Sequence, residues 1–210
     1  LKQKLARMGL DVPEARFYTS ALATAAFIRD QSPGCSAYVI GEAGLLNALY
    51  DAGITMNDVN PDYVIVGEGR NYSLDSLTKA TNLVLAGAKL IGANSDLSGP
   101  IENGIAPACR ALIAPIEMAT GKQAYFCGKP NPLMMRRAVK HLNAMSRDTV
   151  IIGDRMDTDV ISGMECGMST VLVLSGISTE ATLDEYAYRP SAVLDSVGDI
   201  VTLAEAQHAE

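Results

Sequence analysis

The chain has 210 residues, of which 48% are hydrophobic and 20% charged, and its formal net charge at pH 7 is −7. This acidic balance argues against nucleic acid or an anionic membrane as a partner, because phosphate-rich surfaces are bound through a positive patch. The composition is that of a folded protein with a sizeable core rather than a disordered chain. No apolar stretch approaches the roughly 20 residues that cross a bilayer, so the sequence predicts no membrane span.

The beginning of the sequence and its cysteines bear on location. Lys2, Lys4 and Arg7 lie on an amphipathic pattern that lacks the apolar region and cleavage site of a secretory signal. Four cysteines are too widely spaced for a CxxC metal or redox motif, and each has apolar neighbours. We therefore expect buried, reduced thiols, which suit a cytoplasmic protein.

Short apolar runs of strand length recur along the chain, and segments with helical periodicity separate most of them. The predicted strands cover 37–40, 63–67, 89–93, 124–127, 149–153, 170–175 and 192–194. Predicted helices cover 73–86, 132–145 and 158–166. Buried strands alternating with helices indicate βαβ units and an α/β fold with a mainly parallel sheet.

Residues 94–104 read Asn-Ser-Asp-Leu-Ser-Gly-Pro-Ile-Glu-Asn-Gly. This run is too rich in polar and turn residues for a helix or strand, so we expect a loop of about ten residues. Loops of this length in a compact α/β protein are often functional, although a plain connection remains an equal alternative.

The strongest chemical signal follows the predicted strand 149–153. Asp154 comes directly after that strand, and Asp157 and Asp159 lie at the start of the next helix. Ligands of open α/β sheets bind at the carboxyl ends of strands, and carboxylates there suit Mg²⁺, which takes one or two oxygens from the protein. The alternative is that the three aspartates only cap the helix and interact with its dipole.

A second signal is Lys129, held between Gly128 and Pro130 directly after the predicted strand 124–127. A lysine whose backbone is fixed in this way offers its ammonium group as a point charge for a phosphate. The alternative is an ordinary solvated surface lysine.

Several other kinds of site do not match the sequence. The segment 67–72 has GxG but lacks the last glycine of the dinucleotide-binding fingerprint, and there is no GxxxxGK[ST] loop. His141 lies within a predicted helix and His208 in the polar tail, so a histidine-dependent nucleophile or zinc site is not expected. The aspartates at 154–159 do not have the ligand spacing of an EF-hand.

Taken together, residues 128–132 (Gly-Lys-Pro-Asn-Pro) and 153–159 (Gly-Asp-Arg-Met-Asp-Thr-Asp) resemble the third and fourth motifs of the haloacid dehalogenase superfamily. The closer similarity is to its NagD-like subfamily of sugar, phosphoglycolate and pyridoxal phosphatases. Further matching pieces lie at 17–21, 37–42, 63–67 and 171–177, so the resemblance runs over essentially the whole chain.

This resemblance implies a Rossmann-like core with an α/β cap of the C2 type inserted into it. The expected division is core at 1–31, cap at 32–123 and core again at 124–210. It also implies a Mg²⁺-dependent phosphatase of small phosphorylated metabolites that acts through an aspartyl-phosphate. Relatives form dimers through the cap, so a homodimer of that kind is compatible with it.

The resemblance also assigns roles to individual residues. Lys129 would steady the phosphoryl group and the nucleophile, Asp154 would bind Mg²⁺, and Asp159 would support the water shell of the metal. The residues implied to touch substrate are Asn94, Asp96, Lys129, Arg155, Met156, Asp157 and Thr158. Pyridoxal phosphatases carry a histidine close to the position of Gly99, and its absence here favours a sugar phosphate or broad small-phosphate hydrolysis.

The main departure from the family is the missing nucleophile motif, because no hydrophobic strand followed by DxD occurs in the sequence. We expect that motif upstream of Leu1, within a missing piece of roughly 40 to 60 residues, the length of one βαβ unit and a turn. The 210-residue chain is then predicted to be inactive, and poorly soluble or oligomeric because a central strand is lost. Two alternatives remain: a degenerate homologue that binds a phosphorylated ligand without turnover, and a structural or interaction protein.

Overall fold

The computed structural model describes residues 2–200, so the tail with His208 lies outside the described residues. The chain forms two compact units. The first unit comprises Leu1–Ala93 and Leu112–Tyr125, and the second comprises Asn94–Ala111 and Phe126–Glu210. The division into core and cap at 1–31, 32–123 and 124–210 stays a prediction.

The first unit is built on a sheet with strand order β2-β1-β3-β4-β7. Its strands are β1 (Ser36–Ile40), β2 (Thr55–Met56), β3 (Tyr63–Val66), β4 (Lys89–Gly92) and β7 (Tyr125–Phe126). The pairs β1 with β2, β1 with β3 and β3 with β4 are parallel. All four residues of β3 are buried, as expected for a central strand covered on both faces.

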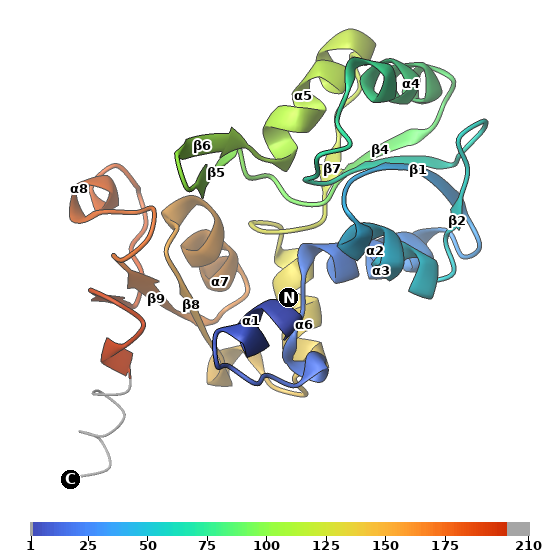
Figure 1. Cartoon of the computed structure of the whole chain (residues 1–210). Helices are drawn as coiled ribbons and strands as arrows, with labels where there is room; N and C mark the ends of the chain where they lie inside the picture. Colours follow the sequence, from blue (N-terminus) through green and yellow to red (C-terminus); the bar gives the residue numbers. More distant parts are fainter. Residues whose placement is uncertain (1, 201–210) are drawn as a thin grey trace, which may run out of the picture. The chain divides into compact units, whose positions relative to one another are not determined.

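Helices cover this sheet, with α4 and α5 on one face and α2 and α3 on the other (Figure 1). The helical segments of this part of the chain are α1 (Lys2–Arg7), η1 (Glu14–Arg16), α2 (Ser20–Gln31), α3 (Ala43–Asp51), α4 (Leu74–Leu85) and α5 (Cys109–Thr120). Thr19 caps α2 by accepting a hydrogen bond from the Leu22 N–H, and Ser73 begins α4 with a capping box.

The second unit contains a parallel sheet with strand order β10-β9-β8. These strands are β8 (Val150–Gly153), β9 (Ser169–Val173) and β10 (Ala192–Leu194). An antiparallel hairpin is formed by β5 (Ser98–Ile101) and β6 (Gly104–Pro107). The helical segments are α6 (Pro132–His141), η2 (Ser146–Asp148), η3 (Met156–Val160), α7 (Ile161–Glu165) and α8 (Glu180–Leu183).

The predicted α/β class with a parallel sheet is confirmed, and each predicted strand overlaps an observed one. The expected loop at 94–104 is wrong in part, because Ser98–Ile101 and Gly104–Pro107 pair as a hairpin. Two short strands joined by a tight turn satisfy each other's backbone groups locally, so they form despite the glycine and proline residues that hide a strand pattern. The predicted helix 158–166 is also shifted, since helical structure begins at Met156 with a π-helical turn.

β8 lies at the edge of its sheet and, within the described part of the chain, pairs only with β9. Its Val150 and Ile152 side chains are 53% and 42% exposed. A buried parallel strand normally has a neighbour on each side and helices over its faces. Among residues 2–200, the outer backbone edge of β8 therefore has no partner strand, and the face that carries Val150 and Ile152 is partly exposed.

Candidate active site

Lys129 lies in a turn that fixes its backbone. Asn131 caps α6 by accepting a hydrogen bond from the Leu133 N–H at 2.9 Å, and its amide donates to the Phe126 carbonyl at 2.7 Å. The Asn131 N–H donates to the Gly128 carbonyl, and the Lys129–Pro130 peptide bond is cis. The three hydrogen bonds fix the backbone of the segment around Lys129, as the sequence pattern predicts.

The Lys129 ammonium group forms an ion pair with Asp159. Its Nζ lies 2.5 Å from Asp159 Oδ1, and the two side chains are 34% and 8% exposed respectively. The second carboxylate oxygen, Oδ2, accepts a hydrogen bond from the Arg155 N–H at 3.2 Å. Asp159 therefore links the lysine to the backbone next to Asp154.

The π-helical turn η3 and Gly153 together place Asp159. A Cβ built on Gly153 would lie 2.2 Å from Asp159 Cγ, a distance that real Cβ atoms do not show. The glycine at the end of β8 is thus required for the carboxylate to fold back over the strand end. The Asp159 carbonyl also accepts a hydrogen bond from the Ser162 hydroxyl at 3.0 Å.

Asp154 is held by the segment 176–178 that follows β9. Its carbonyl accepts a hydrogen bond from the Ser178 N–H, and its Oδ2 accepts one from the Ile177 N–H, both at 2.9 Å. The Ser178 hydroxyl accepts a hydrogen bond from the Met156 N–H at 3.2 Å. The parallel neighbours β8 and β9 therefore bring two loops together at their carboxyl ends.

Gly176 and Ser178 also contact the candidate site, although neither was among the predicted site residues. A Cβ on Gly176 would lie 2.1 Å from Asp154 Oδ2, and Ser178 is only 6% exposed. The signal that could have found them is their position directly after the strand next to β8, where site residues of parallel sheets gather.

Arg155 forms a bidentate ion pair with Asp157. Its Nε and one terminal nitrogen donate to the two oxygens of Asp157 at 3.0 and 2.8 Å, and the other terminal nitrogen reaches the Ser98 carbonyl at 3.4 Å. The hydrogen bonds to Asp157 raise the pKa of Arg155 above its ordinary value, partial burial opposes this, and the charges of Asp96 and Asp154 raise it further. Arg155 thus connects the hairpin β5–β6 to the segment after β8.

The loop that precedes the hairpin contributes Asn94 and Asp96 to the same unit. Asn94 Oδ1 accepts a hydrogen bond from the Asp96 N–H at 3.1 Å, which makes a local turn. Between them, the Ser95 hydroxyl donates to the Lys129 carbonyl at 3.2 Å. The segments 94–98, 128–131 and 154–159 are therefore joined by direct hydrogen bonds.

Met156 and Thr158, like Asp159, are predicted site residues that are buried in the unit. Met156 is fully buried and packs in an apolar cluster with Val160 and Leu172. Thr158 is 3% exposed, and its hydroxyl has no hydrogen-bond partner within the described residues. Their proposed role as substrate contacts stays a prediction.

The oxygen atoms of Asp154 are the candidate protein ligands for a metal ion such as Mg²⁺. Within residues 2–200 no group of three His, Cys, Asp or Glu side chains is arranged to hold a metal, so a cage made only of protein ligands is not present there. Mg²⁺ usually needs only one or two carboxylates and keeps several waters. Asp154 fits this demand, because Oδ2 is occupied by the Ile177 N–H whereas Oδ1 accepts no hydrogen bond from the described residues.

Comparison with known proteins identifies the family of this chain. A family model described as haloacid dehalogenase-like hydrolase matches residues 1–55, and a model described as HAD-hydrolase-like matches residues 126–200. The chain is 50% identical over 200 residues to dihydroxyacetone phosphatase of Corynebacterium glutamicum (strain R), covering 95% of this chain and 73% of that protein. The chain belongs to the haloacid dehalogenase-like hydrolase family.

Two further comparisons concern the NagD branch of this family. The ribonucleotide monophosphatase NagD of Escherichia coli (strain K12) is 46% identical over 200 residues, with 95% of this chain and 78% of that protein covered. The solved structure of NagD from E. coli K-12 superposes with a TM-score of 0.86 over 93% of this chain and 77% of that one. The predicted NagD-like family and the predicted enzyme class, a phosphatase, are thereby confirmed. No helix among the described residues is long and apolar enough to span a membrane.

Proposed function

We propose that the protein hydrolyses phosphate monoesters of small metabolites with the help of Mg²⁺, through an aspartyl-phosphate. The observation that carries this is the arrangement around Asp159, which holds the Lys129 ammonium on one oxygen and the backbone beside Asp154 on the other. A lysine and a carboxylate with an open oxygen at one strand end are what phosphoryl transfer requires of a protein.

The proposed reaction gives each residue a role. The bond between phosphorus and the leaving oxygen breaks while a carboxylate oxygen attacks phosphorus, and water then cleaves the acyl phosphate to release inorganic phosphate. Lys129 neutralises charge on the phosphoryl oxygens, and Asp159 fixes the lysine in position. Asp154 would hold Mg²⁺, which supplies further neutralisation of the phosphoryl group when bound.

The attacking carboxylate is not supplied by the 210 residues, since they contain no strand followed by DxD. We propose that a further strand carrying it pairs with β8, whose outer edge has no partner strand and whose apolar face is partly exposed in the described structure. The 210-residue chain by itself is then expected to release no phosphate.

The substrate class is proposed from the relatives, which are named dihydroxyacetone phosphatase, ribonucleotide monophosphatase and acid sugar phosphatase. Arg155, Asp157 and the hairpin that Arg155 contacts are proposed to select the leaving group. A cytoplasmic location, a cap at 32–123 and a homodimer through that cap remain part of the proposal.

The experiment measures phosphate release by the complete gene product with a panel of small monoesters, with and without Mg²⁺. Lys129→Met and Asp154→Asn are expected to lower kcat by at least about a hundredfold, the usual cost of losing one charge-stabilising group. Lys140→Met changes an exposed lysine of α6 and is the matched control. Full activity of either site variant would contradict the proposal.

A second candidate is a homologue that binds a phosphorylated ligand without turnover, and the absence of a hydrophobic strand that ends directly in DxD is the observation that favours it. The intact mass of the natural gene product separates the two functions. A mass above 22.2 kDa by about 5 kDa, the size of one βαβ-like piece, supports the phosphatase. A mass of 22.2 kDa would favour the binding protein.

A further inference from the structure

The first unit contains a cavity of about 530 Å³ in which none of the candidate active-site residues takes part. This volume lies in the range of small-molecule sites in proteins, roughly 300 to 1,000 Å³. The buried residues Val84, Ala88, Leu90 and Ile91 make up its apolar lining, here called the floor. An apolar floor of this kind favours a ligand with a hydrophobic body.

Aromatic rings form one wall of the cavity. Phe27 and Tyr125 are stacked, with ring centroids 4.8 Å apart and an angle of 23° between the planes. The buried Tyr63 also lines the cavity, and its hydroxyl is 2.9 Å from the Ser32 hydroxyl. Tyr125 is 42% exposed although it is stacked, so part of its ring remains open to a planar partner.

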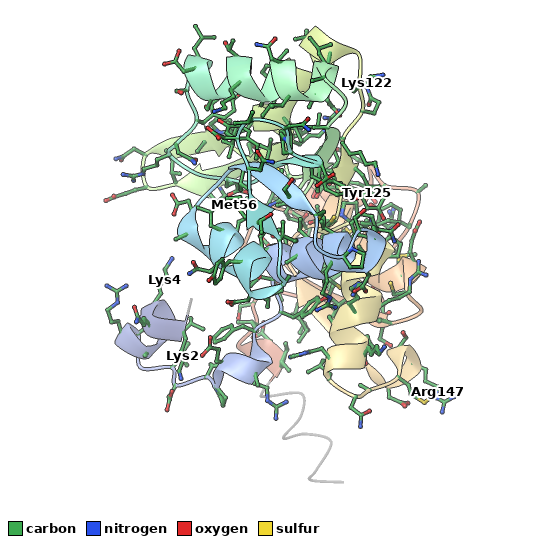
Figure 2. All side chains as sticks on the ribbon, turned by 90° about the vertical axis from the view of Figure 1, so that its right-hand side faces the viewer. Lys2, Lys4, Met56, Lys122, Tyr125 and Arg147 are labelled. Carbon is green, nitrogen blue, oxygen red and sulfur yellow. The ribbon has the colours of Figure 1, made fainter. Side chains whose placement is uncertain are left out.

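Two lysines, Lys89 and Lys122, bring positive charge to this cavity. Lys89 Nζ lies over the Tyr63 ring, 5.4 Å from its centroid, and Lys122 projects from the ribbon in Figure 2. Within residues 2–200 neither ammonium forms an ion pair. The carboxylate that acts on Lys89 electrostatically is that of Asp62, and one of its oxygens already accepts hydrogen bonds from Ser36.

Two lysines without an ion pair among the described residues are notable on a chain whose net charge is −7, because they place two positive charges at the cavity. The polar side chains of Gln31 and Gln123 complete the lining. The combination of an apolar floor, a stacking wall and two ammonium groups is complementary to a flat ring that carries a negative charge.

We propose that this cavity is a binding site for a small aromatic carboxylate. The ring of the ligand lies on the floor against Tyr125 and Phe27, and its carboxylate interacts with Lys89 and Lys122. The site is separate from the phosphatase chemistry, because it shares no residue with it. The proposal therefore does not depend on the proposed function.

The test uses 2-naphthoate as the probe and the neutral analogue 2-naphthol as its control, titrated into the ¹⁵N-labelled complete gene product. We expect saturable binding of 2-naphthoate with Kd below about 1 mM. The amide shifts should be largest at Lys89, Lys122 and Tyr125. Binding of 2-naphthol should be at least about fivefold weaker, since it lacks the charge.

Variants locate the site without changing the fold, because the replaced side chains are exposed. Lys122→Gln and Lys89→Gln are each expected to weaken 2-naphthoate about five- to tenfold while leaving 2-naphthol unchanged. Tyr125→Leu should weaken both probes, and Lys140→Gln, on α6 of the second unit, should affect neither. Absence of saturation, equal loss in Lys140→Gln, or largest shifts at Asp154 would each overturn the proposal.

Discussion

Gly176 lies so close to Asp154 that a Cβ built on the glycine would be 2.1 Å from the Oδ2 atom of that aspartate. The same oxygen accepts a hydrogen bond from the Ile177 N–H, so the glycine is the reason that the loop after β9 can approach the carboxylate. One oxygen of Asp154 is thereby tied to the backbone, and the other is left for a ligand.

Gly176→Ala should displace the Asp154 carboxylate, since a methyl group there has no room. We expect the Mg²⁺ concentration for half-maximal activity of the complete protein to rise at least about tenfold, as for loss of an outer-shell partner of a metal ligand. The Ile177 amide resonance should shift in the variant even without metal, because it loses its carboxylate acceptor.

Gly44→Ala is the matched control for this substitution. Gly44 lies in α3 without a positive φ, and a Cβ added to it would meet no atom within 4 Å. Alanine there is expected to stabilise the fold by about 0.5–1 kcal/mol through helix propensity, with the Mg²⁺ dependence unchanged. An unchanged Mg²⁺ dependence in Gly176→Ala as well would show that the loop does not position Asp154.

The ion pair between Lys129 and Asp159 is expected to matter for both stability and catalysis. Asp159→Asn removes the charge from a carboxylate that is 8% exposed and leaves the lysine without its counter-ion. Thermal unfolding should show a loss of about 1–3 kcal/mol, the range for losing a charge-assisted hydrogen bond in a partly buried place. Asp148→Asn, at an exposed aspartate of η2, should leave the unfolding midpoint unchanged.

The strand ends that carry the site could be predicted from the sequence because β8 and β7 are short apolar runs followed closely by Asp154 and Lys129. The residues that contact Asp154 and Lys129 could not be predicted from the sequence. Ser178 and Gly176 belong to a loop far along the chain, and only the parallel pairing of β8 with β9 brings them to Asp154. The π-helical turn that begins at Met156 could not be predicted either, because the sequence of apolar and polar residues in a π-helical bulge does not differ from that at an ordinary helix start.

The hairpin β5–β6 is a second case in which tertiary structure overrides the local pattern. Gly99 and Pro100 lower strand propensity, yet the register of Ser98 opposite Pro107 makes a ladder. The contact from Arg155 to the Ser98 carbonyl then gives this hairpin a fixed place beside the site. No spacing rule connects residues that are 57 positions apart.

Arg155→Lys tests whether the contact of Arg155 with the Ser98 carbonyl stabilises the hairpin β5–β6. Lysine keeps the charge but cannot donate at the same time to both oxygens of Asp157 and to the Ser98 carbonyl. We expect amide exchange of residues 98–107 to accelerate at least about fivefold, and KM to rise more than kcat falls. Arg147→Lys, an exposed pair with Asp148, is the control, and unchanged exchange in Arg155→Lys would contradict the role of the arginine.

The cysteines give a prediction of pH dependence. Burial raises the pKa of the Cys35 thiol, with the charge of Asp62 adding to it, and burial likewise raises the pKa of Cys166. A raised thiol pKa means that the folded protein binds the proton more tightly than the unfolded chain. This difference in thiol pKa contributes to the free energy of unfolding. The contribution is fully present below the thiol pKa of the unfolded chain, about 8.5, and is lost as the pH rises through the thiol pKa of the folded protein.

Two measurements check this expectation on the reduced protein. Alkylation by iodoacetamide at about pH 8 should be slower in the native protein than in guanidinium chloride, where the same thiols have ordinary pKa values. The thermal midpoint should fall as the pH rises above about 8.5, and Cys35→Ala should make this fall shallower. Cys35 is buried and Cys166, unlike the other three cysteines, is only partly buried. Native alkylation as fast as that of the unfolded chain would show that both thiols are ionised and accessible, contrary to this expectation.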